Sequence, residues 1–268
     1  MPAIAHLLAI CAYGGAAALA AAPFVRPVAP PVRGVVWLLA IGVTSHAVGL
    51  LVLGLRLGAP PVTGMGPALS FAAFLVAAML LAAELLAREV SLTLAAAPLA
   101  AIVTIAALGA GLSPLPGPIE TTGHWLTAHV AMSFLGIAAF ATAAAAGLMY
   151  LVERRELKSR RFGAIFRFFP PLETLDRVNH VAAVVGWLAL TVGVALAGVH
   201  ALAFRLADPG KIVWAFAAWL AVTALTGGRV IAGWRARRAA VVSSISFAAV
   251  VALYIALRLV SGHRGQFL

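Results

Sequence analysis

The chain has 268 residues, of which 63% are hydrophobic and 10% are charged, and its net charge is +11. Average soluble domains carry about 25% charged residues, so this composition excludes a soluble globular protein, and its hydrophobicity excludes a disordered one. The excess of Lys and Arg is typical of the cytoplasmic loops of membrane proteins, so we expect a lipid bilayer and no nucleic acid as partner.

Eight apolar runs are long enough to cross a bilayer as helices, which takes about 20 residues each. Pro and Gly cluster between the runs, where Pro ends a helix and Gly allows a turn. The runs lie at about 4–25, 34–55, 67–87, 90–111, 126–152, 181–204, 212–228 and 239–260. We predict an all-α polytopic membrane bundle of about eight transmembrane helices, organised as a single domain over 1–268.

The distribution of Lys and Arg predicts how the helices are oriented. No basic residue precedes the first run, whereas Arg26 and Arg33 follow it, which indicates a retained helix rather than a cleaved signal peptide. With eight spans, one side of the membrane collects fourteen of the nineteen Lys and Arg residues, and that side should be cytoplasmic. Both termini are then periplasmic, in a bacterial inner membrane. The longest connection, 153–180, is cytoplasmic; it could lie on anionic headgroups or serve as an ordinary topology anchor.

The seven histidines are the residues most able to carry chemistry, because neutral imidazole binds transition metals and haem iron. Five fall near the predicted outward face: His6, His124, His129, His200 and His263. His46 lies near the middle of the second run, where it could be a ligand or hydrogen-bond a neighbouring helix. The mid-membrane positions carry no paired carboxylates, which argues against a proton- or sodium-coupled transporter. The i,i+4 spacing of Glu84 and Arg88 predicts an ion pair.

Three segments carry a resemblance to a known family: LTAHVAMS at 126–133, PPLETLDR at 170–177, and DPGK at 208–211 followed by WAFAAW at 214–219. On these motifs the chain resembles the cytochrome c assembly family of membrane proteins, which includes CcsA and CcmC. The likeness is strongest over 125–265 and closest to the short HemX/YpjD-like branch. His46 matches a histidine in the second helix of YpjD-like members.

The resemblance implies a haem site. By position, His129 and His263 look like the two external histidines that this family places around a haem. His46, together with His200, would then form a second, deeper or transit site. Trp214 and Trp219 could stack on the porphyrin, or anchor the helix at the membrane interface. Two features of the family are missing: the first part of the tryptophan-rich motif, and a histidine of the seventh helix, where Gly227 stands.

The single cysteine, Cys11, excludes the CxxCH motif, so we expect haem to be held as a non-covalent b-type group. The predicted function is haem handling in cytochrome c biogenesis, with apocytochrome or other assembly components as partners and no enzyme activity. The alternative is a HemX-like accessory protein that stabilises or regulates a haem-synthesis enzyme or another partner through the 153–180 loop.

Overall fold

The computed structural model describes residues 2–25, 31–57, 61–62, 65–87, 92–113, 124–159, 170–204 and 209–262. All regular structure within these ranges is helical, which confirms the all-α prediction. The helices in chain order are α1 (Pro2–Val25), α2 (Val32–Leu57), α3 (Met65–Ala87), α4 (Thr93–Gly109), α5 (His124–Ser159), α7 (Leu172–Phe204), α8 (Pro209–Val230) and α9 (Ala236–Gly262).

Seven of these helices are long and apolar enough to cross a membrane, which confirms the predicted membrane bundle. The exception among the described helices is α4, whose apolar part, Ala96–Gly109, is shorter than a span. Its first turn is held by a carboxylate from α3, because Glu84 Oε1 accepts hydrogen bonds of 2.8 Å from both the backbone N–H and the hydroxyl of Thr93. The predicted partner of Glu84, Arg88, lies outside the described residues.

The predicted connection between the fifth and sixth runs, 153–180, is longer than the connection in the structure, because the helices on both sides extend into it. Helix α5 continues through the charged segment to Ser159, and α7 begins at Leu172 instead of near 181. Glu, Arg, Leu and Lys favour helix as strongly as most apolar residues do, so a loss of hydropathy at the membrane surface does not end a helix. Within the predicted 153–180 loop, only residues 160–169 lie outside the described ranges.

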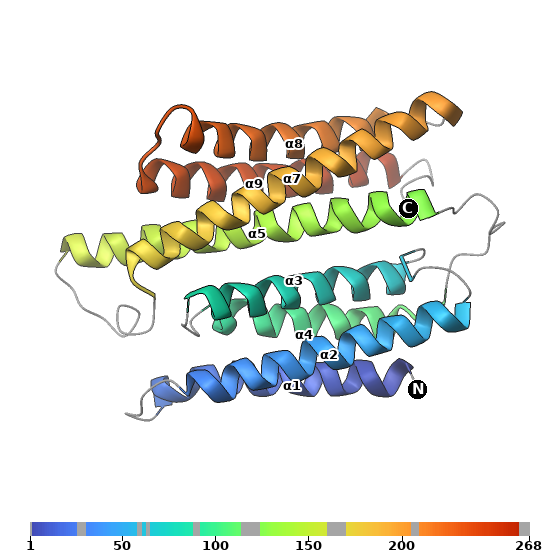
Figure 1. The fold of residues 1–268 in the computed structure, drawn as a ribbon, viewed down its shortest axis with the longest axis horizontal. Coiled ribbons are helices and arrows are strands. Elements are labelled where there is room, and N and C mark those ends of the chain that lie inside the picture. Colours follow the sequence, from blue (N-terminus) through green and yellow to red (C-terminus); the bar gives the residue numbers. More distant parts are fainter. Residues whose placement is uncertain are drawn as a thin grey trace. The chain divides into compact units, whose positions relative to one another are not determined.

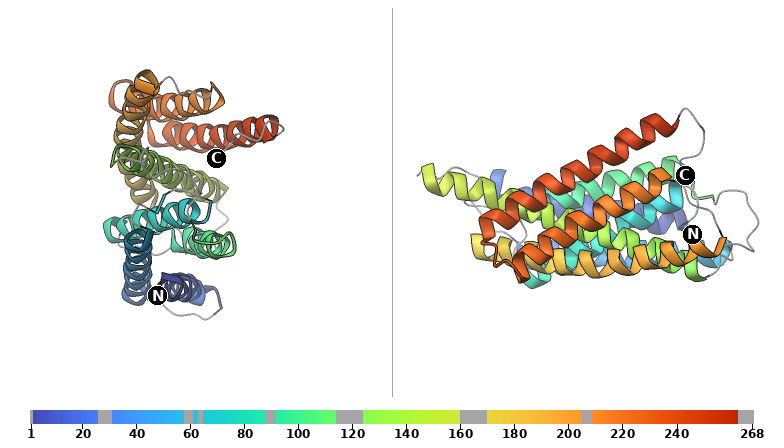
Figure 2. Two further views of the ribbon diagram at one scale, coloured as in Figure 1. Left: turned by 90° about the vertical axis from the view of Figure 1, so that its right-hand side faces the viewer. Right: turned by 90° about the horizontal axis from the view of Figure 1, so that it is seen from above.

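The helices form two compact units, and each is described here by itself. In unit 1, α1 packs against α2 and α4, and α3 packs against α2 and α4. In unit 2, α5 packs against α7 and α9, and α8 packs against the same two helices. Within each unit the long axes of the helices run in broadly the same direction, and α7 crosses the other helices of unit 2 at an angle (Figures 1 and 2). The single domain expected from the sequence stays a prediction.

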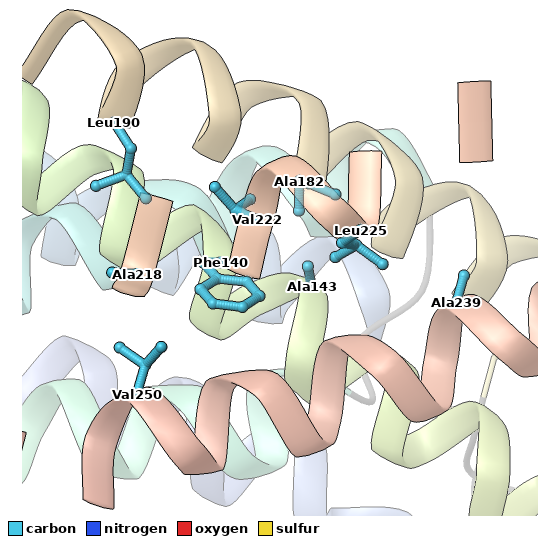
Figure 3. Packing of buried hydrophobic residues seen from close by; sticks show 10 residues of the cluster. Phe140, Ala143, Ala182, Leu190, Ala218, Val222, Leu225, Ala239 and Val250 are labelled. Atoms are coloured by element: carbon cyan, nitrogen blue, oxygen red, sulfur yellow. The ribbon is translucent and has the colours of Figure 1, made fainter. Parts of the chain in front are cut away.

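Small residues bring α5 and α7 into close contact in unit 2. A Cβ on Gly186 would lie 3.2 Å from the carbonyl oxygen of Gly136, so the two backbones nearly touch. Helices that pack in lipid commonly use small residues in this way. Beside this contact, the fully buried ring of Phe140 lies among Ala218, Val222 and Val250 (Figure 3). This core holds α5 and α7 in the register that the candidate site requires.

Candidate functional site

His129 is anchored by one ring nitrogen to the neighbouring helix. It lies near the start of α5, is half-buried, and its Nδ1 is 2.8 Å from the carbonyl oxygen of Gly193 on α7. A carbonyl oxygen only accepts hydrogen bonds, so Nδ1 carries the proton and Nε2 keeps its lone pair in the neutral ring. Among the described residues, Nε2 has no hydrogen-bond partner. The ring is therefore oriented and has one nitrogen available for a metal.

Helical spacing and close packing explain how this arrangement forms. Trp125 stands four residues before His129, and the two rings stack with their centroids 6.0 Å apart and their planes 9° apart. Across the interface, a Cβ on Gly193 would lie 2.8 Å from Oγ of Ser133 on α5. Because Gly193 has no side chain to collide with Ser133, α7 approaches α5 closely enough for the Gly193 carbonyl to reach the imidazole of His129.

The two candidate tryptophans lie on α8 and are fixed by their indole N–H groups. Trp219 Nε1 donates to Oγ1 of Thr191 at 3.0 Å, and Trp214 Nε1 donates to the carbonyl oxygen of Val250 on α9 at 3.1 Å. Thr191 is two residues from Gly193, so Trp219 and His129 bind to the same stretch of α7. Positions 191 and 193 lie on different faces of the helix, so the two side chains approach α7 from different sides.

Two of the predicted haem histidines are not located by the structure. His263 lies outside the described residues, and His200 belongs to the last turns of α7 but its side chain is not described. The predicted pairing of His129 with His263 therefore stays a prediction.

His46 is fully buried in unit 1, within a chain of four hydrogen-bonded side chains. Its Nε2 lies 3.0 Å from Ser70 Oγ on α3, and its Nδ1 lies 3.2 Å from the Tyr13 hydroxyl on α1. Ser70 Oγ also lies 2.7 Å from Nε2 of His6, whose Nδ1 is 2.7 Å from the carbonyl oxygen of Pro2. The two imidazole rings stand 5.0 Å apart.

The carbonyl at one end of this chain fixes the direction of every hydrogen bond in it. His6 donates from Nδ1 to Pro2, so its Nε2 accepts from the hydroxyl of Ser70. Ser70 then accepts from Nε2–H of His46, and Nδ1 of His46 accepts from the hydroxyl of Tyr13. Both nitrogens of His46 are engaged, so a metal would have to break one of these bonds.

Two glycines on α2 make room for this chain. A Cβ on Gly49 would lie 2.7 Å from Nδ1 of His6, and a Cβ on Gly42 would lie 2.5 Å from the Tyr13 ring. The glycines are seven residues apart, as are His6 and Tyr13 on the antiparallel α1. The sequence places His6 only near the predicted outward face, and no motif marks Tyr13 or Ser70. The matching seven-residue spacing is the signal that points to His6 and Tyr13.

A second polar cluster, also missed from the sequence, joins the four helices of unit 2. It lies toward the end of the unit opposite to His129. The guanidinium of Arg229 on α8 donates to the carboxylate of Asp176 on α7. Asn179, one turn further along α7, donates to the carbonyl oxygen of Ala143 on α5 and to the hydroxyl of Ser243 on α9. These bonds satisfy buried polar groups and fix the order of the four helices.

The fold and the buried polar clusters are those of a multi-pass helical membrane protein. The sequence profile of the family described as "Cytochrome C assembly protein" matches residues 63–263, which reach across both units. The chain belongs to the cytochrome c assembly protein family, as its motifs indicated. The match does not separate the branches of the family, so the HemX/YpjD-like branch stays a prediction.

Several curated relatives carry the name cytochrome c biogenesis protein CcsA. The protein from Synechococcus sp. strain WH7803 is 35% identical over 95 residues, covering 34% of this chain and 29% of the relative. The one from Synechococcus sp. strain CC9605 is 29% identical over 160 residues, covering 50% and 52%. The one from Guillardia theta is 26% identical over 151 residues, covering 49% and 50%. The chain thus spans about half, or less, of the length of these relatives. No solved structure matches the chain at a significant level.

Proposed function

We propose that the protein binds haem as its cargo in cytochrome c assembly and uses His129 as an axial ligand. The observation that carries this proposal is the bond from His129 Nδ1 to Gly193, which leaves Nε2 unprotonated and free among the described residues. Histidines that bind metals usually donate their other N–H to a carbonyl or carboxylate, because this bond orients the ring and makes the ligand more basic. His129 thus fits haem.

The other residues of the proposed site come from family resemblance and position. His263 is the proposed second axial ligand, and Trp214 and Trp219 are the proposed aromatic contacts of the porphyrin. Haem would be held without covalent bonds, since the sequence lacks a CxxCH motif. A deeper site at His46, assisted by His200, would first require His46 to leave Ser70 or Tyr13. When bound, haem supplies a redox-active iron, while the protein holds and orients it.

The proposed setting is the bacterial inner membrane, with both termini in the periplasm. The uneven distribution of Lys and Arg supports this orientation. His129 would then lie toward the periplasmic face, where cytochromes c are assembled, and apocytochrome or other assembly components would be its partners.

The test is haem titration of the purified full-length protein, followed by absorption spectroscopy. We expect a Soret band with low-spin features in the wild type and in His180→Ala, a control on α7 in the same unit. We expect His129→Ala and His129→Ala/His263→Ala to lose the low-spin spectrum, and added imidazole to restore it in part. A wild-type spectrum in the double variant would reject the proposal.

A second assay separates haem binding from the accessory role considered in the sequence analysis. If the protein only supported a partner through the 153–180 segment, His129→Ala would leave cytochrome c maturation in cells unchanged. Glutamine in place of the basic residues of that segment would abolish it. The haem proposal expects His129→Ala to impair maturation.

A further inference from the structure

The end of unit 2 where α5 ends and α9 begins carries a dense group of exposed cations. Three of them lie in the last turns of α5, and three lie at the junction between the α8–α9 turn and the start of α9. The α5 residues and the α8–α9 residues are far apart in sequence, but the ends that carry them lie on the same side of the unit (Figures 1 and 2). The six residues, here called the basic cluster, are Arg154, Arg155, Lys158, Arg235, Arg237 and Arg238.

Two adjoining pockets lie within the basic cluster. The larger, of about 620 Å³, lies between Arg154 and the 232–241 segment. The smaller, of about 460 Å³, lies along the end of α5. Arg154 and Arg237 line both pockets, so they stand at the boundary between them. Cations from two separate helices therefore converge on one hollow surface.

Glu153 and Glu156 lie on α5 among the cations of the basic cluster, but Glu153 is buried and neither glutamate lines a pocket. Neither pocket is lined by an Asp or by another Glu within the described part of the chain. The ion pairs of the described residues use Arg177 and Arg229, and none of the six cluster residues takes part in one. Like charges gathered in this way repel one another, so an anion bound among them would be stabilised by several cations at once.

Local packing builds the wall of the larger pocket. Gly233 adopts a positive φ of 59°, which turns the chain sharply after α8. The Trp234 ring packs over Gly228, where a Cβ would come within 2.5 Å of the indole. The guanidinium carbon of Arg238 lies over the Trp234 ring, 4.5 Å from the ring centroid. The tryptophan thus holds a cation at the pocket.

The position of the pockets relative to the membrane spans identifies the class of anion. The span of α8 ends at Val230 and the span of α9 begins at Ala236, so the larger pocket opens where the chain leaves the bilayer. The apolar side chains Leu151 and Val241 line the pockets together with the cations. Ile231, which precedes the pocket-lining residue Ala232, is 87% exposed. Cations next to exposed apolar surface match a phosphate headgroup with its acyl chains.

We propose that the basic cluster is a binding site for the headgroup of an anionic phospholipid, with Arg154 and Arg237 as its central contacts. The phosphate oxygens accept hydrogen bonds from these guanidinium groups, and the acyl chains extend along the apolar surface of α5 and α9. This site is independent of haem: it uses none of the residues of the proposed haem site.

The test is native mass spectrometry of the detergent-purified full-length protein, titrated with cardiolipin and with phosphatidylcholine. We expect cardiolipin to bind in preference to phosphatidylcholine. Each basic residue at an anionic membrane surface contributes about 1 kcal/mol, so Arg154→Gln/Arg237→Gln should weaken cardiolipin binding about 30-fold. The control Arg33→Gln/Arg56→Gln removes two exposed charges on α2, which belongs to the other unit, and should change binding less than about threefold.

Three results would overturn the proposal. One is equal binding of cardiolipin and phosphatidylcholine, and another is an equal loss of binding in the two double variants. The third is retention of inorganic phosphate as strongly as of cardiolipin, which would make the cluster a site for soluble anions. If the glutamine variant fails to fold, Arg154→Lys/Arg237→Lys replaces it. Because that variant keeps both charges, it must bind cardiolipin within about fivefold of the wild type.

Discussion

The Nδ1 of His129 and the carbonyl oxygen of Gly193 are joined by a 2.8 Å hydrogen bond between α5 and α7. The bond depends on the absence of a side chain at position 193, because a Cβ there would lie 2.8 Å from Ser133 Oγ and 3.2 Å from its backbone nitrogen. Gly193→Ala must move α7 away from α5 or displace Ser133, and either change disturbs the carbonyl that orients the imidazole.

We therefore expect Gly193→Ala to weaken haem binding about tenfold, the usual lower range for loss of a partner that orients a metal ligand. Haem titration measures the effect. Gly198→Ala is the matched control, since it lies on the same helix and a Cβ there meets nothing within 4 Å. Equal affinity in the two variants would show that the Gly193 contact does not orient the ligand.

Ser70 is the central link of the buried chain in unit 1, and its removal has a defined consequence. Ser70→Ala leaves Nε2 of both His6 and His46 buried without a partner. Each unsatisfied buried group costs about 1–3 kcal/mol, so the protein should unfold at a clearly lower temperature or denaturant concentration.

The control for this prediction is Ser45→Ala. Ser45 Oγ donates only to the carbonyl oxygen of Gly42 within α2, so its loss strands no buried side chain of another helix. We expect this variant to unfold close to the wild type. Similar unfolding of the two serine variants would contradict the proposed role of the buried chain.

The positions of the helices could be predicted from hydropathy, but their ends could not. A run of about 20 apolar residues is a direct signature of a span, and seven such helices are present in the described chain. Hydropathy reports the solvent around a helix and not its hydrogen bonds. It therefore missed that α5 continues through Arg154 and Lys158 and that Glu84 anchors the start of α4.

The partners of the histidines were beyond prediction for a different reason. Position along a helix predicts the depth of a residue in the bilayer but not whether it faces the bundle or the lipid. The structure shows that His46 is fully buried in unit 1. Its partners depend on the rotation of α2 against α1 and α3, and a small change of rotation would direct it toward lipid. The same holds for His129, whose carbonyl partner on Gly193 carries no sequence signal of its own.

The orientation of the protein can be tested by reporter fusions. Because fourteen of the nineteen basic residues fall on one predicted side, we expect that side to be cytoplasmic. Alkaline phosphatase fused after the last residue should be active, and the same enzyme inserted at 160–169 should be inactive. A fluorescent protein that matures only in the cytoplasm serves as the reciprocal control, and the opposite pattern would invert the topology.

The contact between Arg229 and Asp176 should be the ion pair on which unit 2 most depends. The Arg229 side chain is only 8% exposed, and its guanidinium donates to the carboxylate and to the backbone carbonyl of Asp176. Asp176→Asn removes the negative charge and leaves a nearly buried cation. Breaking a buried pair by removing one partner costs about 3–5 kcal/mol, and we expect a loss toward the lower end because Asp176 is 34% exposed.

Glu173 offers a control on the same helix, one turn before Arg177. Its pair with Arg177 is 3.9 Å long, and the side chains are 89% and 62% exposed. Exposed pairs contribute about 0–1 kcal/mol, so Glu173→Gln should leave unfolding almost unchanged. Measured side by side in detergent, Asp176→Asn should unfold well before Glu173→Gln. If the two variants unfolded together, Arg229 would be solvated well enough to need no carboxylate, and the cluster would not fix the order of α5, α7, α8 and α9.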